Sequence, residues 1–168
     1  GSLAAEHALE PPHMEQAWSQ LRQMHEAGLA HRDLSEHSFA ADAGAVHLTS
    51  ASLGTIAATD VQQRLDAASL LVMLSCLTTP EQAVASALTE YRHEALVRVL
   101  PALQRFALSP GARALLRGRR GVLARVQQAV ADLAPDLPVE DLRLERLRPR
   151  TIISLVAGSI AAYVLVSQ

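Results

Sequence analysis

Hydrophobic side chains recur at helical spacing near the start of the chain. The first stripe runs from Met14 to Met24 through Trp18, and Gly28 follows it closely. Because glycine adopts the backbone conformation that ends many helices, the pattern predicts a helix over residues 13–27. The simplest role for this stripe is packing against a core.

A second, longer helix is predicted to begin at Thr59 or Asp60, either of which can cap it, and to stop before Pro80. Residues 70–74 are apolar without interruption. A helix that is apolar on every side belongs in the interior of a domain, so we expect this one to be central and buried.

Between these helices, residues 29–56 change character. Two short apolar pieces, Phe39-Ala40 and Val46-His47-Leu48, flank Asp42-Ala43-Gly44. Apolar runs separated by a few turn-forming residues predict a β-hairpin.

The remaining apolar stripes predict further short helices. Their expected positions are a helix opened by Pro80-Glu81, one over residues 96–107 that Ser109-Pro110-Gly111 breaks, a basic helix and turn over 113–120, one over 123–133, and a charged helical stretch over 139–150 after a linker bracketed by Pro135 and Pro138.

Composition adds two absences: the 168 residues include no lysine and no asparagine, and all fifteen basic residues are arginine. The chain alone therefore cannot complete a mechanism that needs a lysine amine or an asparagine amide.

Aromatic residues make up only 3% of the chain, and this low content, with abundant Ala and Leu, favours helices. The single cysteine, Cys76, excludes an internal disulfide and a cysteine zinc site, and its apolar neighbours predict a buried thiol.

The formal net charge of −2 hides a marked asymmetry along the chain. Residues 1–90 carry three Arg against eleven acidic residues, whereas residues 91–168 carry twelve Arg against six. Such a split suggests that the C-terminal half faces something anionic, either nucleic acid or a membrane surface.

The last eighteen residues, 151–168, carry no charge, and four arginines precede them. This length is at the lower limit for crossing a bilayer, so the pattern predicts a transmembrane helix, with a buried soluble helix as the alternative. The arginines would mark the cytoplasmic side and contact anionic headgroups; nucleic-acid phosphates or a solvated face are the competing readings. These arginines are Arg143, Arg146, Arg148 and Arg150.

The stretch His31-Arg32-Asp33-Leu34 follows the first predicted helix and its glycine. It resembles the entry to the protein-kinase catalytic loop, whose H-R-D-L sequence carries the catalytic base. The resemblance implies that Asp33 is a vestigial base and that His31 and Arg32 shape the loop. In that family an Asn five residues after the Asp binds magnesium, but position 38 is Ser38.

Two further positions extend the resemblance. The slot for the magnesium-binding Asp of D-F-G falls on Ser50, or on Ser52 in a shifted register, and a hydroxyl is a weak magnesium ligand. Asp66 lies on the predicted buried helix, where kinase-like folds hold an aspartate that bonds the backbone of the H-R-D loop. The resemblance implies this structural role for Asp66.

A degenerate kinase-like lobe followed by arginines and an apolar span also resembles actinobacterial membrane proteins that join such a lobe to a lysylphosphatidylglycerol-synthase or flippase-type transmembrane domain. This resemblance implies a cell-membrane location with the lobe on the cytoplasmic side. The implied partners are the lipid bilayer, a missing upper lobe and a downstream transmembrane domain, with no nucleic acid.

The fold class expected is therefore mainly α: a kinase-like helical C-lobe with a short β-hairpin, plus a C-terminal transmembrane helix. The expected divisions are a disordered segment 1–12, the lobe 13–135, a basic juxtamembrane linker 136–150 and the start of a transmembrane helix 151–168.

The expected function is a catalytically incomplete, pseudokinase-like regulatory or binding module, tethered to a membrane protein and without enzymatic activity of its own. The alternative is a fragment of an active atypical kinase, or of an enzyme similar to aminoglycoside phosphotransferases, whose upper lobe is missing. No cofactor is expected, Mg-ATP included, and no metal site, because the histidines His25, His31, His37 and His47 follow no zinc spacing.

Overall fold

The computed structural model describes residues 9–42, 45–49 and 54–134. The chain divides into two units, residues 1–137 and 138–168, and all described residues belong to the first. The elements in order are α1 (Pro11–Glu26), β1 (Leu29–Ala30), η1 (Glu36–Ser38), β2 (Phe39–Asp42), β3 (Ala45–Leu48), β4 (Thr55–Ile56), α2 (Asp60–Leu77), α3 (Pro80–Ala87), α4 (His93–Val97), η2 (Leu100–Ala102), α5 (Pro110–Leu115) and α6 (Val122–Ala131).

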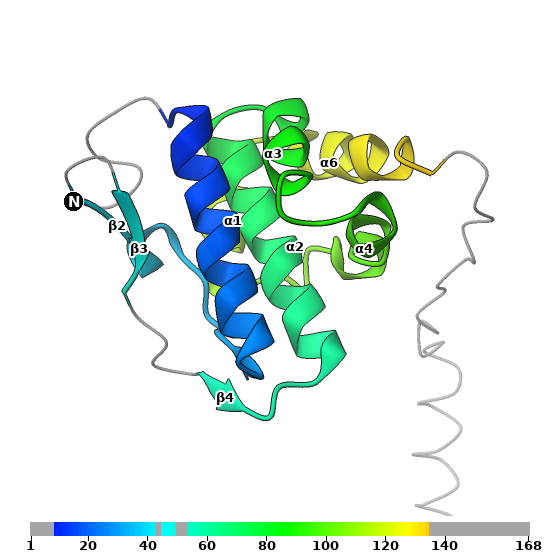
Figure 1. The fold of residues 1–168 in the computed structure, drawn as a ribbon. Coiled ribbons are helices and arrows are strands. Elements are labelled where there is room, and N and C mark those ends of the chain that lie inside the picture. The colour runs from blue at the N-terminus through cyan, green and yellow to red at the C-terminus, as the bar shows by residue number, and fades with distance from the viewer. Residues whose placement is uncertain (1–8, 43–44, 50–53, 135–168) are drawn as a thin grey trace, which may run out of the picture. The chain divides into compact units, whose positions relative to one another are not determined.

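Helices α1 and α2 lie side by side and antiparallel at the centre of the domain (Figure 1). Thr59 caps α2 by accepting a hydrogen bond from the Gln62 amide, and the Gln62 side-chain oxygen accepts a hydrogen bond from the Thr59 amide. Every residue from Asp66 to Cys76 is buried, as the uninterrupted apolar run predicted. The core forms around α2 because this helix has almost no face for solvent.

Trp18 anchors α1 in that core and is fully buried. Its indole Nε1 donates to the Ser86 hydroxyl of α3 at 3.1 Å, so the one polar atom of the ring is satisfied. The Tyr91 ring meets it edge to face, with centroids 5.6 Å apart. These contacts join α1 to α3 and to the segment that follows α3.

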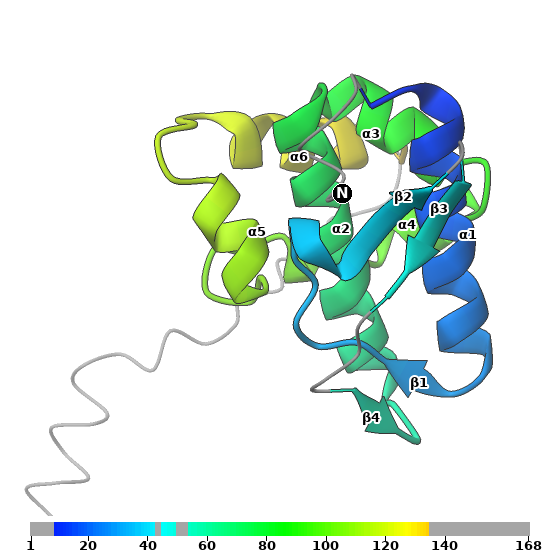
Figure 2. The same ribbon diagram turned by 90° about the vertical axis from the view of Figure 1, so that its left-hand side faces the viewer.

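The expected hairpin is present as β2 and β3, which pair antiparallel with Phe39 opposite Leu48. It packs on α1, where the Gln16 side chain accepts a hydrogen bond from the Val46 amide at 2.7 Å. A second antiparallel pair, β1 with β4, sets Leu29 opposite Ile56 at the end of α1 and the start of α2 (Figure 2).

The predicted continuous helix over residues 96–107 is wrong. The chain forms α4, the short 3₁₀ helix η2 and a loop in its place. Pro101 explains the break, because proline has no amide hydrogen and its ring clashes with the preceding turn of an α-helix. Phe106, expected on the apolar stripe, is 68% exposed in the loop. Helix α5 also begins at Pro110, three residues before the basic helix that the sequence predicted.

The transmembrane part of the expected fold class is also corrected. Within residues 9–42, 45–49 and 54–134 there is no helix of the length and hydrophobicity needed to cross a membrane. The longest of these helices, α2, carries three charged residues in its first two turns, Asp60, Arg64 and Asp66. The apolar segment 151–168 and the basic linker 136–150 lie outside the described residues. The structure is a mainly helical domain with two small two-stranded sheets.

Candidate functional site

The segment His31-Arg32-Asp33 follows β1 directly. Gly28 connects the end of α1 to β1. Gly28 has a φ of +74°, the left-handed conformation that glycine adopts without steric cost. Its carbonyl accepts a hydrogen bond from the Ala58 amide at 2.8 Å, just before α2. The entry to the loop is therefore fixed between the end of α1 and the start of α2.

The Asp66 carboxylate holds the backbone of this loop from α2. Its Oδ2 accepts from the His31 amide at 2.6 Å and its Oδ1 accepts from the Arg32 amide at 2.8 Å. The side chain of Asp66 is buried, with 2% exposure of the residue. The hydrogen bonds expected from the resemblance are thus present. Two charge-assisted bonds are the kind of partner that a buried carboxylate requires.

Arg32 has a φ of +67°, in the left-handed region that non-glycine residues rarely adopt. Such a conformation costs on the order of 1–3 kcal/mol and persists only where neighbouring contacts impose it. Two hydrogen bonds hold the peptide groups on either side of the Arg32 Cα: the Arg32 amide donates to Asp66 Oδ1, and the Asp33 amide donates to His31 Nδ1. The Arg32 side chain is exposed, and its Nη1 donates to the Thr55 hydroxyl of β4 at 3.3 Å.

His25 closes the other side of the Asp66 carboxylate. Its Nε2 lies 3.5 Å from Asp66 Oδ2, and its side chain is only 9% exposed. The His25 carbonyl accepts a hydrogen bond from the Gln63 side chain at 2.9 Å. The carboxylate is therefore shielded from solvent by α1 as well as by the loop.

The His31 imidazole is buried and neutral. Burial lowers its pKa, and the nearby Asp66 and Asp33 charges oppose that effect more weakly. Nδ1 accepts a hydrogen bond from the Asp33 amide at 3.3 Å, so the ring proton is on Nε2. That Nε2 has no partner among the described residues. The buried ring packs against the backbone of the loop.

This burial predicts a pH dependence of stability. The pKa of His31 in the folded protein lies below its ordinary value of 6.5, so the unfolded chain binds more protons as the pH falls through 6.5. The stabilisation from neutral His31 is complete above that value and decreases below it, by at most about 1.4 kcal/mol per pH unit. Urea unfolding between pH 7.5 and 5.5 measures this loss.

The variant His31→Gln is expected to lose less stability than the natural protein over the same pH interval. Glutamine does not titrate, and its side-chain oxygen can still accept a hydrogen bond. The matched control is His93→Gln, because His93 is exposed, and it should leave the pH profile unchanged. Equal pH profiles for His31→Gln and the natural protein would contradict the assignment.

Asp33 and Ser38 differ in their burial and in their side-chain hydrogen bonds. Asp33 is half-buried, and its carboxylate has no hydrogen-bond partner among the described residues. Ser38 is 3% exposed, and its hydroxyl accepts from the Ser35 amide at 3.0 Å and lies 3.5 Å from the Asp33 carbonyl. The Ser38 hydroxyl thus holds the loop 33–38 in its turn.

A second clamp on the loop comes from the start of α5, which sequence reasoning treated only as a break. The Ser109 hydroxyl donates to the Leu34 carbonyl, and the Ser109 amide donates to the Ser69 hydroxyl of α2 at 3.0 Å. Gly111 lies so close to the loop that a Cβ there would be 2.6 Å from the Cα and Cβ of Ser35. The adjacent small residues of Ser109-Pro110-Gly111 were the signal for this contact.

Some of the other expected site residues are exposed, and the rest lie outside the described residues. His37 and His47 are exposed. The described ranges contain no group of three or more His, Cys, Asp or Glu side chains that could hold a metal ion. Ser50, Ser52 and the arginines at 143, 146, 148 and 150 lie outside the described residues. Cys76 is buried, and burial raises the pKa of its thiol.

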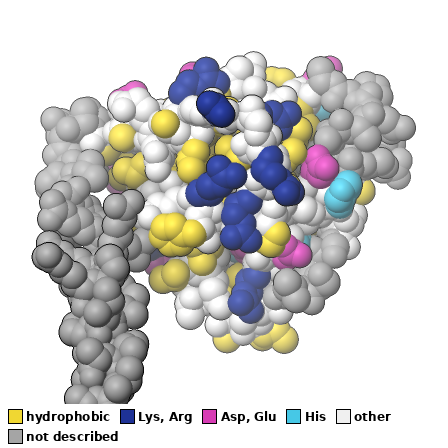
Figure 3. Space-filling model, turned by 180° about the vertical axis from the view of Figure 1, so that it is seen from behind, with side chains coloured by type: hydrophobic (Ala, Val, Ile, Leu, Met, Phe, Trp, Pro, Cys, Tyr) yellow, Lys and Arg dark blue, Asp and Glu magenta, His cyan; other side chains and the backbone are white. Residues whose placement is uncertain are grey.

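Arginines and acidic residues are distributed unevenly along the described chain. Residues 95–131 contain seven arginines, all exposed, and no acidic residue. Dark blue arginine side chains form a band across the face opposite the view of Figure 1, with few acidic side chains beside it (Figure 3). The arginines of this segment are Arg98, Arg105, Arg113, Arg117, Arg119, Arg120 and Arg125.

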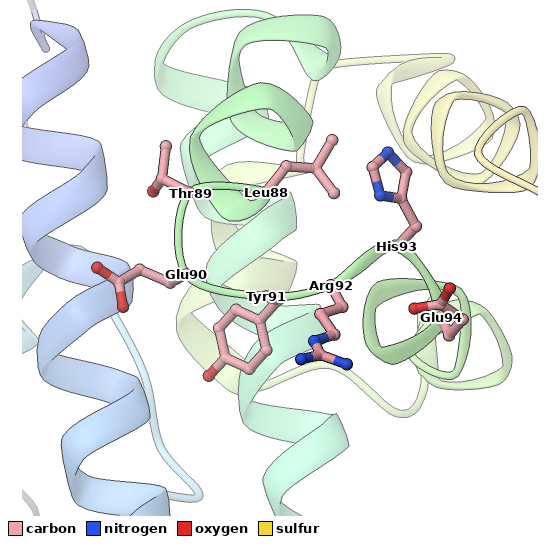
Figure 4. A pocket seen from close by; sticks show the side chains of 7 residues that line it. All are labelled: Leu88, Thr89, Glu90, Tyr91, Arg92, His93 and Glu94. Atoms are coloured by element: carbon pink, nitrogen blue, oxygen red, sulfur yellow. The ribbon is translucent and has the colours of Figure 1, made fainter.

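Two cavities lie away from the loop. One, of about 470 Å³, is lined by the segment 88–94 between α3 and α4 (Figure 4). The other, of about 370 Å³, lies among α1, α2 and α4, and Tyr91 lines both. The Tyr91 hydroxyl is buried without a partner among the described residues, and burial raises its pKa. Neither cavity is lined by the residues of 31–38.

Comparison of the chain with protein-family models, with curated proteins and with solved structures found no match in any of the three. The site therefore has to be interpreted from its own geometry.

Proposed function

We propose that this chain is a kinase-like lower lobe that no longer transfers phosphate and acts by binding, as a pseudokinase-like regulatory module. One observation carries the proposal. The Asp66 carboxylate receives both the His31 and the Arg32 amides, and so presents Asp33 on a loop of fixed shape. An unrelated helical domain has no need for this arrangement around an H-R-D sequence.

The chemistry of the loop supports the loss of catalysis. Phosphoryl transfer depends on metal ions and a lysine to position the phosphates and neutralise their charge. The chain has no lysine and no asparagine, and the matching metal positions are serines. The hydroxyl at Ser38 is engaged with the Ser35 amide. A base at Asp33 has no partner groups to act with.

A second candidate is an active phosphotransferase of the atypical-kinase or aminoglycoside-phosphotransferase type, completed by an upper lobe from outside these residues. The observation that favours it is the half-exposed Asp33 carboxylate, which forms no bond to another described residue. A base held ready for a substrate hydroxyl would have this environment.

Nucleotide titration separates the two candidates. With ATP at millimolar concentration, the unfolding temperature should be the same with Mg²⁺ and with EDTA, because no carboxylate or amide stands at the metal positions. ADP release should equal that of buffer, for the natural protein and for Asp33→Asn alike.

The binding-module proposal fails if Mg²⁺-dependent ADP release is measured and Asp33→Asn abolishes it. The matched control is Asp60→Asn, an exposed aspartate at the start of α2 that is paired with Arg64. If Asp60→Asn reduced release equally, the activity would not come from the loop. Circular dichroism of each variant confirms that the comparison is made between folded proteins.

A further inference from the structure

The surface around α5 is positively charged, and the loop 31–38 does not account for this charge. Between Arg105 and Arg120 the chain carries five arginines and no acidic residue, and all five are exposed. None of them forms an ion pair with another described residue, because the ion pairs of the described residues involve Arg22, Arg64, His25 and His37. We name this surface the basic face: Arg105, Arg113, Arg117, Arg119 and Arg120.

The fold brings these arginines together on one side of the domain. Arg113 lies on α5, and Arg117 follows directly after the Leu116 cap that ends this helix. Arg119 and Arg120 follow in the turn between α5 and α6, which Gly118 and Gly121 form with φ values of +82° and +83°. Helix α5 lies behind α2 in the view of Figure 1, on the side where the band of arginines is seen (Figures 2 and 3).

Outside the basic face, Glu81 of α3 lies near Arg125 of α6. A backbone hydrogen bond is the main cause of the lowered pKa of Glu81, and the charge of Arg125 lowers it further. Further arginines, Arg98 and Arg125, flank the basic face along the chain. Five like charges without counter-charges repel one another, so the surface is suited to an external anionic partner.

An exposed phenylalanine gives the basic face an apolar anchor. Phe106 is adjacent to Arg105 and is 68% exposed, although the same loop buries Leu103 and Leu108. A large aromatic ring beside cationic side chains is the combination that peripheral proteins use at an anionic lipid surface, where the ring enters the headgroup region and the charges meet the phosphates.

Nucleic acid fits these observations less well. Single strands are held by several stacked aromatic rings, and Phe106 is the only aromatic residue of 95–131. Duplex readout needs a helix that can lie in the major groove, whereas α5 has six residues. We propose that the basic face binds the surface of a membrane rich in anionic phospholipid, peripherally and through side chains of the described domain.

Vesicle co-sedimentation of the full chain tests this proposal. Vesicles of phosphatidylcholine containing about one third phosphatidylglycerol should bind the protein, and vesicles of phosphatidylcholine alone should not, because the attraction is to net charge. The triple variant R117Q/R119Q/R120Q should weaken binding about 100-fold, since each arginine at such a surface contributes about fivefold. Phe106→Ser should weaken it about tenfold.

The matched control is R143Q/R146Q/R148Q, which removes the same charge from another part of the chain. It should weaken binding less than the triple variant on the basic face. The opposite order would overturn the proposal.

Soluble glycerol phosphate at millimolar concentration should not displace the protein from vesicles. Displacement would indicate a single-phosphate site and would also overturn the proposal. Equal or tighter binding to a 20-base-pair DNA duplex, lost in R117Q/R119Q/R120Q, would assign the face to nucleic acid.

Discussion

Replacing Asp66 by alanine is expected to lower the free energy of unfolding by about 3–5 kcal/mol, because the His31 and Arg32 amides would both lose their buried acceptor. Water cannot readily take the place of the carboxylate, since the residue is 2% exposed and His25 closes its other side. Arg32 would also lose one of the two contacts that hold its left-handed backbone. Equilibrium unfolding in urea measures the loss.

Two further variants keep this test informative. Asp66→Asn retains the shape and one acceptor oxygen, so it should cost less than alanine and still leave one amide unsatisfied. Asp60→Asn is the matched control, because Asp60 is exposed on the same helix and its pairing with Arg64 should be worth no more than about 1 kcal/mol. Equal effects at positions 60 and 66 would mean that Asp66 does not hold the loop.

Replacing Gly111 by alanine is expected to cost about 2–3 kcal/mol. The added Cβ would lie 2.6 Å from both Cα and Cβ of Ser35 and 2.8 Å from the Leu34 carbonyl oxygen. Two of these three atoms belong to the backbone, so relief requires movement of the loop rather than of a flexible side chain. Urea unfolding measures the cost.

Two further substitutions serve as controls for Gly111→Ala. Gly118→Ala adds a methyl group where no atom lies within 4 Å, so only its φ of +82° opposes the change, at a cost of about 1–2 kcal/mol. Ser35→Gly removes one of the crowded atoms, and in a double-mutant cycle it should recover at least about 0.5 kcal/mol of the Gly111→Ala loss. Strict additivity of the two substitutions would show that Gly111 does not press on Ser35.

The parts of the fold that sequence reasoning predicted correctly are those set by neighbouring residues. Helix α1 follows from its apolar stripe and the glycine after it, and α2 follows from the Thr59 cap and the proline beyond its end. The hairpin follows from two short apolar pieces around a turn. Each of these signals lies within the element it specifies or a few residues from its end, so no tertiary contact is needed to interpret it.

The predicted helix over residues 96–107 failed because one residue outweighed a pattern. The apolar stripe over 96–107 has helical spacing, but Pro101 removes an amide within it and the chain forms α4 and η2. Phe106 then falls in a loop, and its hydrophobicity no longer reports burial. The spacing of the stripe alone does not show this interruption, whereas the proline at position 101 does.

The candidate site was predictable only in part, for a related reason. The bonds from Asp66 to the loop were expected from the likeness of the H-R-D stretch and the following helix to kinase-like folds. The contacts of Ser109 with Leu34 and Ser69 were not, because their partners lie 75 and 40 residues away. A small residue in a sequence does not reveal which distant backbone it touches.

The same distances have a consequence for the order in which the protein folds. Both clamps on the loop join residues far apart in the chain: 34 and 35 residues to Asp66, and 75 from Leu34 to Ser109. Contacts across such separations form only after the intervening chain has collapsed, because loop closure carries an entropic penalty. The His31–Asp33 segment should therefore acquire its shape late on the folding pathway, after α1 and α2 have docked and α5 has closed over it.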